Sequence, residues 1–118
     1  MSTPALLNNY ALLATTAELA YQPVEPAKVV HGPATVGVAE LATLGDVAIG
    51  VWEMSPSVTT DIEVDECFVV LDGDATVSFD DGTAPLQLQP GSVGFLKAGT
   101  ATTWTVRRTL RKIYIARA

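Results

Sequence analysis

Asp61 and Glu66 are the two carboxylates whose spacing could support acid–base chemistry. Side chains alternate along a strand, so Thr59 and Asp61 share one face, and Glu66 on the following strand can join them. If both carboxylates enter a confined apolar cavity, repulsion between two negative charges raises the pKa of one of them. That carboxyl group keeps its proton and can act as a general acid. Such a pair could hydrolyse or deaminate a small nitrogenous metabolite. The alternative is that structural ion pairs hold each carboxylate, with Lys97 or Lys112 as partner.

Other kinds of catalytic site find little support in the residues. The single histidine, His31, lies outside the segment that supplies the proposed cavity, so no Ser-His or Cys-His nucleophile can be assembled there. His31 is expected to be an exposed loop residue. Cys67 alternates with Glu66, so we expect its thiol to face away from the cavity and to be inert.

From Ala34 onward the sequence predicts an all-β fold. Short runs rich in Val, Ile, Thr and aromatic residues are separated by the Gly, Asp and Pro typical of tight antiparallel turns, including one at residues 72–74. No segment between them is long enough for a crossover helix, which favours a sandwich or closed barrel. The nine predicted strands are residues 34–43, 46–55, 57–64, 66–72, 74–80, 84–89, 93–97, 101–107 and 110–117.

Residues 1–33 are expected to lie outside the barrel of residues 34–118, within a single domain. Apolar residues spaced three and four apart over residues 4–21 are compatible with a short helix. The alternative is an extended arm that pairs with another strand. Pro23, Pro26 and Pro33 then close the segment as a loop.

Composition excludes several classes of protein. Thirteen acidic and seven basic residues give a net charge of −6, which argues against a nucleic-acid partner. No apolar run approaches the ~18 residues that a membrane span needs. A single cysteine, without a recognisable signal peptide, predicts a cytoplasmic protein. Eight acids lie within residues 61–81 and five bases within residues 107–117, and we expect these segments to neutralise one another, with anion binding as the alternative.

Two stretches resemble the motifs of the cupin family. Glu66 is followed by six residues and Gly73, and Gly91 is followed by five residues, Lys97, one residue and Gly99. The segments GVWEMS, DECFVVLDG, KAGTATTW and RKIYI are similar to small cupins related to (S)-ureidoglycine aminohydrolase, over about residues 47–117. The resemblance implies a double-sheet jelly-roll barrel whose interior can hold a small ligand.

The resemblance also implies where a metal would bind. It places Thr59, Asp61 and Thr102 where cupins carry metal-binding histidines, beside Glu66. Two carboxylates and two hydroxyls do not supply the imidazole or thiolate ligands typical of catalytic zinc or iron. We therefore expect no cofactor, with weak binding of Mn, Mg or Zn as the alternative.

Several further side chains are candidates for the pocket wall. Trp52 and Trp104 alternate in step with the inward-facing positions, which include Met54 and Thr102. They could line a ligand pocket, or at least one of them could pack in the core. Phe68 is likewise a candidate either to line the ligand pocket or to pack in the core.

Three hypotheses of function follow. The first is a homodimeric cupin that binds a small polar metabolite and has a degenerate metal site. The second is a metal-assisted aminohydrolase acting on a ureido or amino-acid-like substrate, with Glu66 and Asp61 as ligands or as acid and base. The third is a structural or interaction protein in which Trp52, Phe68 and their neighbours fill the barrel. Because this fold hosts many functions, the fold alone does not rank them.

Overall fold

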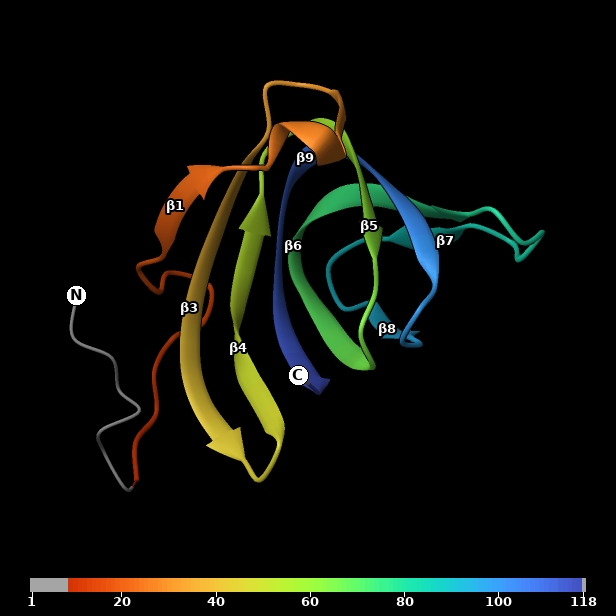
Figure 1. Ribbon diagram of the computed structural model, residues 1–118. Coiled ribbons are helices and arrows are strands. Elements are labelled where there is room, and N and C mark those ends of the chain that lie inside the picture. Colours follow the sequence, from red (N-terminus) through yellow and green to blue (C-terminus); the bar gives the residue numbers. More distant parts are fainter. Residues whose placement is uncertain (1–8, 118) are drawn as a thin grey trace.

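The computed structural model describes residues 9–117 as a curled antiparallel sheet of nine strands that forms a jelly-roll barrel (Figure 1). The predicted all-β class is confirmed. A short 3-10 helix, Pro26–Lys28, precedes the second strand. The strands are β1 (Ala20–Pro23), β2 (Val29–His31), β3 (Thr35–Leu44), β4 (Val47–Met54), β5 (Ser57–Ile62), β6 (Glu66–Phe79), β7 (Leu86–Leu88), β8 (Val93–Leu96) and β9 (Ala101–Arg117).

Strand β9 holds the barrel together because it pairs with three other strands. Its first half lies between β5 and β6, and its second half lies between β4 and β6. The register sets Trp52 opposite Lys112 and Thr59 opposite Trp104. Since paired residues point to the same face, these side chains are all directed into the barrel.

Two predicted strand breaks are absent. Asp72–Asp74 is not a turn, because β6 continues through it with register shifts against β9, and Gly73 has a φ of 113°. Residues 107–110 likewise belong to one long strand. A β-bulge bends a strand without ending it, so here β6 and β9 curve together around the barrel.

The segment before the barrel is extended where the structure describes it. Residues 9–21 contain one turn and no α-helix, so the predicted helix is wrong over that range; residues 4–8 lie outside the described part. The backbone carbonyls of Ala14 and Ala17 accept hydrogen bonds from Arg111 Nη1, at 2.9 and 3.0 Å. β1 then pairs with β3 along its edge (Figure 1). Arg111 thereby fixes the arm against the barrel.

A cluster of apolar side chains is buried inside the barrel, and two of its members, Met54 and Trp104, also line a cavity. The buried cluster includes Phe68, Val77 and Leu110, each fully inaccessible to solvent. No helix among residues 9–117 is long and apolar enough to cross a membrane.

Candidate functional site

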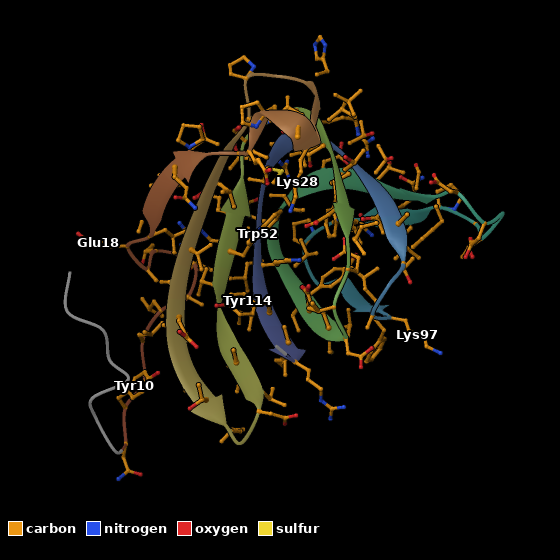
Figure 2. The ribbon with its side chains drawn as sticks, viewed as in Figure 1. Tyr10, Glu18, Lys28, Trp52, Lys97 and Tyr114 are labelled. Carbon is orange, nitrogen blue, oxygen red and sulfur yellow. The ribbon has the colours of Figure 1, made fainter. Side chains whose placement is uncertain are left out.

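A cavity of about 190 Å³ opens from the barrel interior. It is large enough for several water molecules or one small metabolite. Trp52 on β4 and Tyr114 on β9 come from two paired strands and both line this cavity. Lys97 lies away from them, in the connection between β8 and β9 (Figure 2). The lining residues are Trp52, Met54, Thr59, Asp61, Glu63, Glu66, Trp104, Lys112 and Tyr114.

A buried ion pair lies against this cavity. The Lys112 ammonium donates a hydrogen bond to Glu66 Oε2 at 2.6 Å, and the two side chains are 5% and 9% exposed. Removing both charges from water is costly, and it is tolerated because each charge has the other as partner. The pair of Glu66 with Lys112 was one of the two alternatives that the sequence raised for this carboxylate.

Aromatic rings surround the same ammonium. Lys112 Nζ lies 4.5 Å from the centroid of the Trp52 ring and 4.6 Å from the centroids of Phe68 and Trp104. Trp104 also packs at an angle against the other two rings, with centroid separations of 5.7 and 5.9 Å. Ring faces are negative, so they stabilise a cation where water is excluded. Within residues 9–117, Lys112 is thus enclosed by one carboxylate and three π faces.

Glu63 supplies a second fixed carboxylate. Its Oε2 accepts hydrogen bonds from Thr102 Oγ1 at 2.5 Å and from Trp104 Nε1 at 3.0 Å. Its backbone is bonded to Gly99 and Thr100, which anchors the β5–β6 connection to the turn before β9. Glu63 therefore holds one orientation at the cavity wall.

Asp61 lies at the rim rather than in the interior. Its Oδ1 accepts a hydrogen bond from Lys28 Nζ at 3.1 Å and another from the backbone N–H of Ile62 at 2.8 Å. Both partners of the ion pair are 46% exposed. The hydrogen bond to Asp61, followed by the carboxylate charge, raises the pKa of Lys28 above its ordinary value.

Tyr114 completes the wall on β9. Burial raises the pKa of its hydroxyl above the ordinary value of 10.0, and the negative charges of Glu40 and Glu66 raise it further. Tyr114 also lies against Gly50, where any Cβ would approach the hydroxyl too closely. The phenol therefore stays neutral and can donate or accept a hydrogen bond at physiological pH.

The sequence of this chain matches the EutQ-like cupin domain over residues 41–114. It belongs to that family. The cupin resemblance is thereby confirmed, although the matching family is EutQ-like. A comparison with curated proteins finds no match.

Solved structures share the fold of this EutQ-like cupin. The Clostridium difficile EutQ protein is 23% identical with a TM-score of 0.62, over 71% of this chain and 63% of that one. A putative ethanolamine utilization protein Q from Salmonella typhimurium is 20% identical with a TM-score of 0.63, over 86% and 97%. A Pseudomonas syringae protein of unknown function is 23% identical with a TM-score of 0.74, over 85% and 44%. This chain thus spans less than two thirds of the Clostridium and Pseudomonas proteins.

The predicted site residues of this EutQ-like cupin do not all line the same cavity. Thr59 and Glu66 line the cavity, and Asp61 lies at its rim. Thr102 is buried and donates a hydrogen bond to Glu63, which lines the cavity, whereas Thr102 itself lines a neighbouring, more open hollow. Phe68 is fully buried behind the Lys112 ammonium. The pocket candidates that line the cavity directly are Trp52, Met54, Thr59 and Trp104.

Glu63 was missed as a site residue, and Lys112 was considered solely as an ion-pair partner. Residues 59, 61 and 63 have the same parity, so the alternation that selected Asp61 also pointed to Glu63. The position of Lys112 depends on its register opposite Trp52, which the sequence does not specify. Its burial is not expected for a lysine without a partner.

The remaining predicted residues lie elsewhere. His31 is exposed on β2 rather than in a loop, and Cys67 is a free thiol bordering a surface hollow on the opposite face of β6. The acidic and basic segments do neutralise one another. Arg107 binds Asp74 at 2.9 Å and Arg108 binds Asp72 at 3.5 Å.

Proposed function

We propose that this cupin binds a small polar metabolite in the cavity without a metal ion. The observation that carries the proposal is the Lys112 ammonium, held 2.6 Å from Glu66 and enclosed by aromatic rings. Glu66 is the position that the cupin motif assigns to a metal ligand. Its carboxylate already has a cation as partner, which would repel a second one.

The side chains available as metal ligands also argue against a bound metal ion. No group of three or more His, Cys, Asp or Glu side chains within residues 9–117 is arranged to hold a metal ion. Thr59 and Thr102 offer neutral hydroxyls where imidazoles would be needed, and neither is a strong ligand for a transition metal. The residues present therefore do not fit the metal that many cupins carry.

The charge of the lining favours a ligand with N–H groups or a positive charge. Asp61, Glu63 and Glu66 contribute three carboxylates, and Lys112 is the single cation among the lining residues. Among residues 9–117, the two side-chain hydrogen bonds that the Glu63 carboxylate accepts both go to Oε2, so Oε1 can accept one from a ligand. Trp52 and Trp104 provide flat apolar walls for the rest of the molecule.

Tryptophan fluorescence tests this proposal directly, because Trp52 and Trp104 are the two tryptophans of the chain and both line the cavity. Small amines, amides, ureides and amino acids would be titrated into EDTA-treated protein. We expect saturable changes with at least one of these classes. Glu63→Gln should weaken binding about tenfold or more through loss of a charged hydrogen bond, whereas Lys97→Met at an exposed site should not. Changes that occur only after metal is added would contradict the proposal.

An aminohydrolase similar to the ureidoglycine enzymes is a second candidate, supported by the carboxylates at one cavity. In that case Asp61 and Glu66 would act as acid and base on a ureido or amino-acid-like substrate. Each carboxylate already has a lysine partner, Lys28 for Asp61 and Lys112 for Glu66, and no group of three or more metal-ligating side chains lies among residues 9–117. Ammonia release from small ureido compounds, with stoichiometric Mn, Zn or Ni in untagged protein, would favour the enzyme, whereas no release and no bound metal would favour the binding protein.

A homodimer in the cytoplasm is part of the same proposal. Cys67, Phe95 and Ile115 form one row across β6, β8 and β9 on the outer face, where Phe95 is 72% exposed. The arm covers the outer face near Ile49 and Ile113 but leaves this row open. A second copy could bury it by two-fold pairing. The single unpaired cysteine supports a reducing compartment.

A further inference from the structure

We propose that Lys112 forms a reversible Schiff base with a small aldehyde that carries no negative charge. The inference rests on the proposed function, because it uses the same cavity and names the chemical class of one ligand. Lys112 lines that cavity, although its side chain is 5% exposed. A lysine in a site that excludes bulk water is the kind that forms such adducts.

The surroundings of Lys112 suit an imine better than an ammonium. An ammonium has three N–H donors, and among the described residues one of them has a hydrogen-bond acceptor, Glu66 Oε2. The rings of Trp52, Phe68 and Trp104 also lie against the nitrogen, with centroids 4.5–4.6 Å away, and none of them accepts a conventional hydrogen bond. A protonated imine has one N–H, which Glu66 would satisfy completely. Its positive charge remains, so the three π faces stabilise it as they stabilise the ammonium.

Glu66 is placed to move the protons that this chemistry requires. It takes a proton from the ammonium at 2.6 Å, and the neutral amine attacks the carbonyl carbon. The carbonyl π electrons move to oxygen, which takes a proton from the now positively charged nitrogen to give a neutral carbinolamine. Glu66 returns its proton to that hydroxyl, which leaves as water while the nitrogen lone pair forms the C=N bond. The products are one iminium and one water, with no oxidant or reductant consumed.

The charge of the cavity selects among carbonyl compounds. A 2-oxo acid would bring its carboxylate beside Glu63 and Glu66, and such like charges repel strongly away from water. A neutral aldehyde meets no such penalty. The cavity of about 190 Å³ also limits the ligand to a few non-hydrogen atoms.

Reductive trapping of the full-length protein tests the inference. The protein would be exposed to limiting propanal with cyanoborohydride, and the alkylated sites would be mapped by mass spectrometry. Lys28, Lys97 and Lys112 are the three lysines of the chain, and Lys28 and Lys97 are exposed, so they act as internal references. We expect Lys112 to be alkylated first in the folded protein and all three to react alike in urea. Glyoxylate should not label Lys112. Glu66→Gln should slow the labelling about a hundredfold.

Alkylation confined to Lys28, Lys97 and the amino terminus would overturn the inference, as would equal labelling of Lys112 by glyoxylate. The mapping needs only wild-type protein, so it remains decisive if Glu66→Gln fails to fold. The fluorescence titration with amines and amides contains no carbonyl electrophile. Binding there without trapping at Lys112 would refute the Schiff base alone, whereas trapping without such binding would refute the proposed preference for N–H donors.

Discussion

Lys112 and Glu66 form the least exposed of the ion pairs described within residues 9–117. Breaking such a pair leaves one charge buried without a partner, which is more costly than losing an attraction between solvated charges. The ion pair that lines the ligand site is therefore also expected to affect the free energy of unfolding strongly. Each substitution at either residue must be judged by binding and by folding together.

A double-mutant cycle separates the two contributions. We expect Lys112→Met to lower the free energy of unfolding by about 3–5 kcal/mol, because it leaves the Glu66 carboxylate buried without an ion-pair partner. Glu66→Gln keeps an acceptor for the ammonium and should cost less. The double variant should cost less than the sum of the two, as urea denaturation would measure.

The exposed pair of Lys28 and Asp61 is the matched control for that cycle. Asp61→Asn should change the free energy of unfolding by no more than about 1 kcal/mol, since both side chains are half-exposed. Equal costs for Asp61→Asn and Lys112→Met would show that burial of the inner pair has no energetic importance.

Tyr114 gives a prediction for alkaline pH. Its raised pKa means that its stabilising contribution is complete below about pH 10 and is lost as pH rises through the folded-state value. In an absorbance titration of the three tyrosines, Tyr114→Phe should remove amplitude from the part above pH 10. Loss of amplitude centred at the ordinary tyrosine value instead would mean that the phenol is not shielded.

The alternation of side chains along each strand predicted much of the candidate site. Thr59, Asp61 and Glu66 were assigned to one face by parity, and all three border the cavity. Parity does not tell how far a side chain reaches or which partner it finds. The ion pairs of Asp61 and Glu66 depend on Lys28 and Lys112, whose positions follow from pairing between distant strands.

At the level of elements, the bend in β6 and β9 determines the shape of the barrel. The sequence Asp72-Gly73-Asp74 has the composition of a hairpin turn, and this local signal predicted two strands. Continuous pairing with β9 overrides it, because each strand supplies the other's hydrogen bonds through the bend. A single sequence does not reveal such long-range pairing, so turn and bulge were indistinguishable.

Gly73 is the residue that allows this bend. A Cβ at this position would lie 2.5 Å from the Thr109 carbonyl oxygen and 2.6 Å from Leu110 Cα, both backbone atoms with little freedom to move. We expect Gly73→Ala to lower the free energy of unfolding by about 3 kcal/mol, from strain at positive φ together with the collision.

Gly82→Ala is the control, because Gly82 also has a positive φ but open space around it. It should cost about 1–2 kcal/mol from backbone strain alone. Thermal or urea unfolding of the two variants measures the difference. Costs that do not differ would show that the contact between the two strands at the bend is loose.

For the whole molecule, the strand pattern and the two motifs were sufficient to predict a cupin barrel. The arm was left between helix and extended chain, because three- and four-residue spacing in an apolar segment fits both. Its extended conformation is held by long-range contacts, including the pairing of β1 with β3 and the hydrogen bonds of Arg111 to two arm carbonyls. The Arg111 contacts join residues nearly a full chain length apart, which no local pattern encodes.

The open row on the outer face gives a prediction about assembly. Phe95→Asp would place a charge in the proposed interface, so we expect the variant to be monomeric where the wild type is dimeric by light scattering at micromolar concentration. Val30→Asp is the control, since Val30 is 65% exposed on β2, outside the row. A monomeric wild type would refute the dimer.

Nuclear magnetic resonance of the lysine ammonium groups in metal-free protein tests whether the buried Lys112 ammonium, and not a metal ion, neutralises Glu66. With three lysines, we predict one Nζ signal protected from exchange with water, absent in Lys112→Met and shifted when a ligand fills the cavity. Added Mn²⁺ should leave it sharp, because the ammonium already neutralises Glu66. Stoichiometric broadening by Mn²⁺, or the absence of any protected signal, would contradict the account.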